Sequence, residues 1–170
     1  MGFKMARSFK TQLAGQIGEA LVVAELGRRD IVATAFAGNV PDIDLLAYKD
    51  GKTAAVQVKA WRNGSVSFDA TRYLKISIED EIQTVTGMDQ SLDPDLIFVF
   101  VLIGGELGTD RFFLLPQRNL QSLIEQGYTS FLSKHGGKRP RNALTTHNSV
   151  TLEQLTPFEG NWALIEQRFC

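Results

Sequence analysis

The 170-residue chain is long enough for one domain with a complete hydrophobic core, and its 44% apolar and 22% charged residues are typical of a globular protein. Its formal net charge of −1 excludes a globally basic nucleic-acid-binding chain, so any such activity must depend on local basic patches. The single cysteine, Cys170, cannot form an internal disulfide, and no apolar run is long enough for a signal peptide or a membrane span, so we expect a cytoplasmic protein without membrane association.

The first predicted element is a helix over residues 8–29, for which either Ser8 or Thr11 is a suitable N-cap. Apolar residues at helical spacing form one stripe along it: Leu13, Ile17, Ala20, Leu21 and Ala24. A second side of the same helix contains Gly15, Gly18, Val22, Val23 and Leu26. Glu19 lies on that second side. The two glycines of this side predict that another element packs very close to the helix.

Short strands are expected after this helix. The runs 43–48 and 53–60 flank Asp50-Gly51, a dipeptide that strongly favours a tight hairpin turn. Residues 30–37 are predicted to be a short strand or an extended link, and residues 65–69 are also extended. The region that follows is ambiguous, because its first part alternates like a strand whereas residues 79–86 fit a short helix.

The clearest strand is the apolar run 96–103, whose continuity is typical of a strand covered on both faces. Residues 111–115 are its expected hairpin partner. Helices are predicted over residues 116–126 and 128–133, and a last helical segment contains Trp162, Ile165 and Phe169. This order of elements predicts a single mixed α/β domain over residues 1–170.

Polar residues interrupt the apolar pattern of the predicted hairpin. Side chains alternate along a strand, so Gln57 and Lys59 share one face, and Asp44 on the facing strand can lie beside Gln57. A hard cation such as Mg²⁺ prefers oxygen ligands and keeps several waters. The candidate ligands are therefore the Asp44 carboxylate, the Gln57 carbonyl oxygen and the backbone carbonyl of Val58.

Lys59 and Glu19 supply the remaining chemistry of this candidate site. Burial beside a cation shifts a lysine towards its neutral form, which can take a proton from water. A protonated lysine can instead stabilise charge on a phosphoryl oxygen. Glu19 is a further acidic ligand or orients a bound water, and the combination suits phosphodiester hydrolysis. The structural alternative is an exposed hairpin face with ordinary turn acids.

The chain resembles the PD-(D/E)xK nuclease superfamily, in the branch where glutamine replaces the second acid, as in certain homing endonucleases. The resemblance is carried by three segments: Gly18-Glu19, Pro41-Asp42-Ile43-Asp44-Leu45-Leu46 and Val56-Gln57-Val58-Lys59. It implies a restriction-endonuclease-like core, a mixed β-sheet flanked by α-helices, over residues 8–115, with a helical C-terminal elaboration over residues 116–170. It also implies a metal-dependent DNA endonuclease of the prokaryotic restriction, repair or recombination type.

The resemblance assigns a role to each matched residue. It places Asp44 as the principal metal ligand and Gln57 at the second ligand position. Lys59 is the catalytic lysine and Glu19 the helix acid, with Mg²⁺ as the cofactor and Mn²⁺ as a substitute. Gln57 is neutral, which lowers the expected cation affinity unless Glu19 offsets the lost charge. Asp42 is an alternative ligand, but we favour Asp44 because it directly precedes the strand.

DNA is the expected partner, and basic residues outside the motif are candidates for contacting its phosphates. They are Arg62 and Arg72 after the second strand and, in a basic loop, Lys134, Lys138, Arg139 and Arg141. The alternative for this loop is a merely solvated segment. Trp61 either stacks on a base or packs in the core, and we favour packing in the core. Cutting both strands calls for two active sites, so a homodimer is expected, and the neutral Gln57 motivates the alternative of an inactive nucleic-acid-binding or interaction module.

Overall fold

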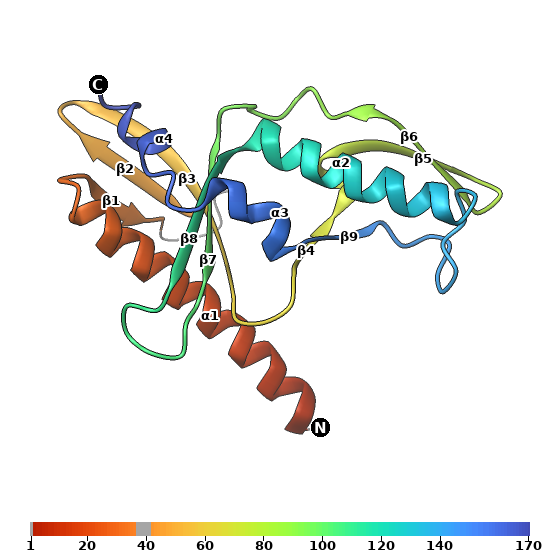
Figure 1. Ribbon diagram of the computed structural model, residues 1–170, viewed down its shortest axis with the longest axis horizontal. Helices are drawn as coiled ribbons and strands as arrows, with labels where there is room; N and C mark the ends of the chain where they lie inside the picture. Colours follow the sequence, from red (N-terminus) through yellow and green to blue (C-terminus); the bar gives the residue numbers. More distant parts are fainter. Residues whose placement is uncertain (1, 37–41) are drawn as a thin grey trace.

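The computed structural model describes residues 2–36 and 42–170, with side chains from residue 9 onward, and within these ranges a five-stranded sheet forms the centre of the molecule (Figure 1). In spatial order its strands are β1 (Val32–Ala35), β2 (Leu45–Lys49), β3 (Lys52–Trp61), β7 (Ile97–Leu102) and β8 (Arg111–Pro116). β3 and β7 are parallel, and the other neighbours are antiparallel. The predicted α/β fold with a mixed sheet and flanking helices is therefore confirmed.

Two hairpins turn through residues with left-handed backbone. β2 and β3 are joined by Asp50 (φ 50°) and Gly51 (φ 81°), as a type I′ turn requires, which confirms the prediction from this dipeptide. The second hairpin joins β5 (Leu74–Glu79) to β6 (Ile82–Met88) through Asp80 (φ 49°) and Glu81 (φ 66°). The helix expected over residues 79–86 is therefore wrong. The turn between β5 and β6 contains no glycine, and glutamate seldom adopts positive φ, so the sequence contained no hairpin signal there.

Helix α1 (Gly2–Gly27) packs on β3 mainly through the second of its two predicted apolar sides, the one that contains Gly18, Val22 and Leu26. Its buried positions repeat every four residues: Ala14, Gly18, Val22 and Leu26. Leu13, Ala20 and Ala24 are exposed, because they face away from this row. The helix begins well before residue 8, so Ser8 and Thr11 lie inside it and the N-cap prediction is wrong.

The contact between α1 and β3 depends on a glycine. A Cβ placed on Gly18 would lie 2.4 Å from Ala60 Cβ, so Gly18→Ala should lower the free energy of unfolding by about 1–3 kcal/mol. No described atom lies within 4 Å of a Cβ placed on Gly15, so Gly15→Ala should raise the free energy of unfolding by about 0.5–1 kcal/mol through helix propensity. Urea unfolding followed by circular dichroism measures the stability of both variants. Equal effects of the two substitutions would contradict the close approach of α1 to β3 at Gly18.

Hydrophobic clusters cover both faces of the central sheet. β7 alternates between them, with Phe98 and Phe100 in the cluster that includes helix α2 (Gln117–Lys134). Ile97, Val99 and Val101 belong to the cluster that includes α1. The prediction of a strand covered on both faces is thus confirmed.

The C-terminal part combines helices with one strand that was not predicted. The two helices expected over residues 116–126 and 128–133 form the single helix α2. β9 (His147–Val150) pairs antiparallel with β4 (Val66–Asp69) and is mostly polar, so its sequence alone does not indicate a strand. The remaining elements are short: η1 (Ala70–Arg72), α3 (Leu152–Leu155), η2 (Thr156–Phe158) and α4 (Ala163–Glu166).

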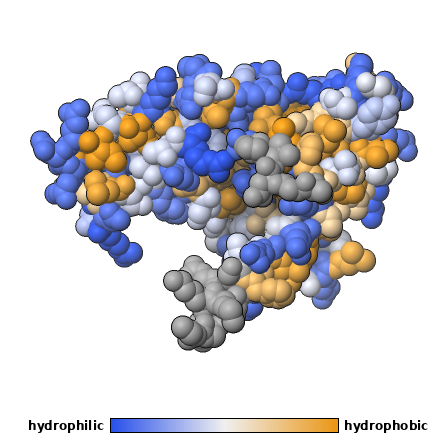
Figure 2. Space-filling model, turned by 180° about the vertical axis from the view of Figure 1, so that it is seen from behind, coloured by the Kyte–Doolittle hydropathy of each residue, from blue (hydrophilic) through white to orange (hydrophobic). Residues whose placement is uncertain are grey.

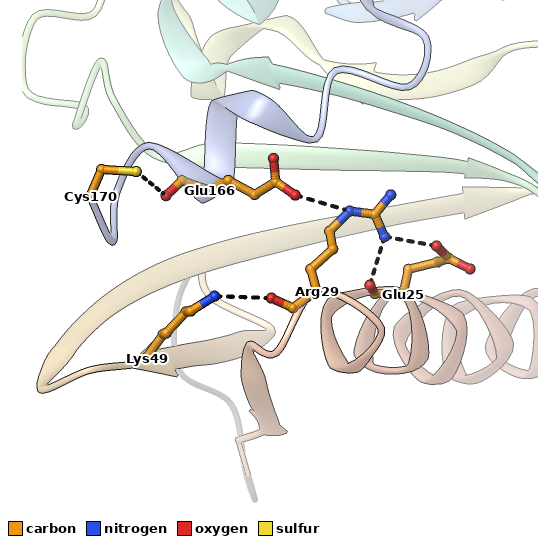
Figure 3. A network of polar contacts seen from close by, with 5 residues as sticks. All are labelled: Glu25, Arg29, Lys49, Glu166 and Cys170. Atoms are coloured by element: carbon orange, nitrogen blue, oxygen red, sulfur yellow. Dashed lines mark hydrogen bonds and ion pairs between the residues drawn. The ribbon is translucent and has the colours of Figure 1, made fainter.

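Arg29 connects the chain's last residues to the end of α1 (Figure 3). Its guanidinium contacts the Glu25 carboxylate (2.9 Å) and the Glu166 carboxylate (3.4 Å), and lies 4.2 Å from the Trp162 ring centroid. Its backbone carbonyl accepts a hydrogen bond from Lys49 Nζ (3.2 Å), so the β2–β3 hairpin joins the same network. The α4 segment is therefore fastened to the sheet and to α1.

The surface is mixed in character. In Figure 2, hydrophilic and hydrophobic side chains alternate over the rear face without a broad apolar area. Within residues 2–36 and 42–170, no helix is both long and apolar enough to cross a membrane.

Candidate functional site

A polar pocket of about 160 Å³ lies where the β2–β3 hairpin meets η1. Its lining residues are Asp42, Asp44, Gln57, Lys59, Arg72, Tyr73 and Phe98. The fold thus brings together the three side chains of the predicted hairpin site and two further predicted residues, Asp42 and Arg72. Pro41 of the same motif lies outside the described residues.

Asp44 directly precedes β2, and its backbone N–H donates to the Val56 carbonyl (3.0 Å), which extends the pairing with β3. Its Oδ2 accepts hydrogen bonds from Gln57 Nε2 (2.5 Å) and from the Val58 backbone N–H (2.8 Å). Among the described residues, no donor reaches the second oxygen, Oδ1. The carboxylate is therefore held in place through Oδ2.

The groups around Asp44 fit a hard divalent cation with few protein ligands. The N–H and C=O of one strand residue point to the same side, so the Val58 carbonyl faces the side from which its N–H reaches Asp44. The Gln57 side chain is 7% exposed. The nitrogen and oxygen of its amide are distinguished by their hydrogen bonds, and the bond to Asp44 makes Nε2 the end that faces this carboxylate. Among the described residues, no three His, Cys, Asp or Glu side chains cluster as a metal site. Mg²⁺ is commonly bound by only one or two carboxylates and keeps several waters.

Lys59 lies on the same face of β3 as Gln57, as the alternation of the strand predicts. Burial has the largest influence on the Lys59 ammonium and lowers its pKa. The Asp44 carboxylate opposes this shift, whereas the Arg72 guanidinium adds to it. Lys59 therefore releases a proton more readily than a lysine in water, which suits a group that exchanges protons during a reaction.

Glu19 comes from α1 and does not line the pocket. Burial raises its pKa, and the negative charge of Asp44 raises it further. The two acids are thus close enough to interact electrostatically, although no direct hydrogen bond joins their side chains. The structure therefore places Glu19 near Asp44 but outside the lining of the pocket.

Two pocket residues, Tyr73 and Phe98, were not predicted from the sequence. Tyr73 follows η1 and is 6% exposed, and burial raises its pKa to about 12. Its hydroxyl therefore stays protonated and can donate a hydrogen bond to an anion in the pocket. The only sequence signal for Tyr73 was its position directly after Arg72.

The other predicted DNA-contacting residues lie away from this pocket. Arg62 borders a separate hollow with Phe9, Lys10 and Leu13. The basic segment begins at Lys134, the last residue of α2, and continues in the loop that follows this helix (Figure 1). None of its four cations, Lys134, Lys138, Arg139 and Arg141, lines the pocket.

Part of the basic loop has a structural role. Lys138 forms an ion pair with Glu81 on the β5–β6 turn. The Arg139 guanidinium lies over the Tyr128 and Phe131 rings, 4.9 and 4.7 Å from their centroids, and donates to the His147 carbonyl (2.6 Å). These contacts hold the loop against α2, so Arg139 is engaged with protein groups.

Trp61 packs in the core. It is 8% exposed, and its ring centroid lies 6.4 Å from that of Phe100 and 6.0 Å from that of Phe113. The favoured interpretation of this residue is confirmed, and it is not positioned to stack on a base.

Comparison with known proteins gives one informative result. No protein family and no curated protein sequence matches the chain. Among solved structures, the bacterial homing endonuclease I-Ssp6803I is similar, with a TM-score of 0.53 and 14% sequence identity over 93% of this chain and 94% of that one. The chain therefore has a fold in common with a nuclease.

Proposed function

We propose that this protein is a divalent-metal-dependent DNA endonuclease of the PD-(D/E)xK type, with Gln57 in the position of the second acid. The observation that carries the proposal is the pocket in which Asp44, Gln57 and Lys59 face one another. A fold in common with a homing endonuclease supports DNA as the substrate class. Mg²⁺ is the proposed cofactor, with Mn²⁺ as a substitute, and restriction, repair or recombination is the proposed setting.

In this mechanism Asp44, the Gln57 amide oxygen and the Val58 carbonyl would hold the cation. When bound, such a cation makes water a stronger nucleophile and neutralises phosphate charge. Lys59, whose pKa is lowered, accepts a proton from the attacking water or, when protonated, donates to a phosphoryl oxygen. Glu19 is close enough to Asp44 for the Asp44 charge to raise the pKa of Glu19 beyond the effect of burial, and Glu19 would orient a water at the edge of the site.

Tyr73 and Arg72 complete the anion-binding side of the pocket. The Tyr73 hydroxyl is a neutral donor, and the Arg72 guanidinium offers two parallel N–H groups to a phosphate. Both residues line the same pocket as Lys59, so the three together would supply donors to the phosphodiester. A homodimer would supply the second active site that cutting both strands requires.

The second candidate function is a nucleic-acid-binding or interaction module without catalysis. It is favoured by the neutral Gln57, whose Nε2 donates to Asp44, and by the near-neutral net charge of −1. Such a module would bind DNA and leave it intact in every metal.

The two candidates are separated by incubating the protein with supercoiled plasmid and a labelled four-way junction in Mg²⁺, Mn²⁺ or chelator. The nuclease is expected to nick or linearise DNA in either metal and to be inactive in chelator. Retention of both DNAs in a gel shift, with no cleavage in any metal, would support the binding module instead.

A further inference from the structure

The two aspartates of the motif have different partners in the structure. Asp44 accepts its hydrogen bonds from β3. Asp42 Oδ1 instead lies 2.5 Å from Nη2 of Arg72, thirty positions later in the chain, at the end of η1. Both members of the Asp42–Arg72 pair line the same pocket as Lys59. The pair therefore joins two segments across the site where a phosphate would enter.

This ion pair is easily opened. The side chains of Arg72 and Asp42 are 61% and 51% exposed, so water screens their attraction. An exposed ion pair changes an equilibrium by at most about fivefold. A phosphate that makes two parallel charge-assisted hydrogen bonds to a guanidinium is a stronger competitor than the single contact seen here.

We propose that the Asp42–Arg72 pair is a latch, in which Asp42 holds the Arg72 guanidinium beside the pocket until a DNA phosphate replaces the Asp42 carboxylate. The inference rests on the proposed function and gives Asp42 a role different from metal binding. Asp42 is a positioning residue that keeps Arg72 near Lys59 in the free protein. Arg72 is the residue that contacts the substrate once the latch opens.

The latch has a thermodynamic consequence. Asp42 competes with DNA for Arg72, so the free protein binds DNA more weakly than it would without this carboxylate. The competition also discriminates between ligands, because only an anion that satisfies the guanidinium fork displaces Asp42 at little cost.

Four variants test the latch, beginning with Asp42→Asn, which removes the charge. Asparagine tolerates the positive φ of position 42 (65°) as well as aspartate does. Arg72→Gln removes the substrate contact, and the double variant completes a cycle. Asp95→Asn is the matched control, because the Arg118–Asp95 pair has a similar distance (2.8 Å) and similar exposures (60% and 47%) outside the pocket.

Binding of a short fluorescein-labelled DNA duplex is measured by anisotropy in chelator, over a series of salt concentrations. Asp42→Asn is expected to tighten binding by about three- to fivefold. Arg72→Gln should weaken binding and reduce the slope of log K against log salt by about 1. Most of the gain from Asp42→Asn should disappear when residue 72 is glutamine, and Asp95→Asn should leave binding unchanged.

Several results would overturn the latch. An equal gain from Asp42→Asn in the Arg72→Gln background would reduce it to a general charge effect. Unchanged or weaker binding by Asp42→Asn would reject it while leaving the proposed function intact, because the wild type would still bind and cut. A wild type that neither binds nor cuts DNA would reject both.

Discussion

Replacing Lys59 with methionine is expected to slow metal-dependent DNA cleavage by about 10²–10⁴-fold, the usual contribution of a positioned proton donor or acceptor. Methionine keeps the unbranched apolar stem but cannot carry a proton or a charge. Lys59 interacts electrostatically with Asp44 and Asp42, so the variant also removes a positive charge next to these two acids. Cleavage rates on supercoiled plasmid, with circular dichroism to confirm folding, measure the effect.

The same variant should change how stability depends on pH. The pKa of Lys59 is lower in the folded protein than in the unfolded chain, so the unfolded state binds more protons between the folded pKa and the ordinary value of 10.5. The free energy of unfolding contributed by this group therefore rises with pH through that window. Lys59→Met should lack this rise, which urea unfolding at a series of alkaline pH values would reveal.

Lys75→Met is the matched control for both measurements, since Lys75 is an exposed lysine on β5 that does not line the pocket. It should cleave DNA like the wild type and keep the alkaline rise in stability. Undiminished cleavage by Lys59→Met would remove this lysine from the mechanism.

The part of the site that could be predicted is the part built within one hairpin. Asp50-Gly51 determines the turn, the turn determines the register, and the register places Asp44 opposite Gln57. Alternation along β3 then adds Lys59 on the same face. Each step depends on residues near one another in the chain, so local rules were sufficient.

The rest of the pocket depends on contacts that local rules do not describe. Arg72 and Tyr73 reach the hairpin because η1 follows β4, and β4 is held by β9 from the distant C-terminal part. The partner of Asp42 is equally remote, so the sequence left open which aspartate would bind a metal. Packing beyond the hairpin also decided which of the two predicted apolar sides of α1 is more deeply buried, so Ala20 and Ala24 of the first side are exposed.

Asp44→Asn is expected to abolish both cleavage and the stabilisation of the fold by divalent cations. In the wild type, Mn²⁺ at 100 times its dissociation constant should raise the free energy of unfolding by about 2.7 kcal/mol. The asparagine oxygen can still accept the Val58 N–H, so the variant should fold in chelator. It has lost the charged oxygen that would bind the cation, so its melting temperature should not respond to Mn²⁺.

Asp42→Asn makes this measurement decisive between the two aspartates. Asp42 is engaged with Arg72, whereas the Asp44 carboxylate is held beside the Gln57 amide and the Val58 backbone through its Oδ2. Asp42→Asn should therefore keep the Mn²⁺-induced rise in melting temperature that Asp44→Asn loses. The opposite pattern, with the response lost only in Asp42→Asn, would make Asp42 the ligand and would contradict the latch as well. Asp44 bonds to β3, whereas Asp42 bonds to Arg72. We therefore expect Asp44 to bind the metal and Asp42 to control the contact between Arg72 and the phosphate.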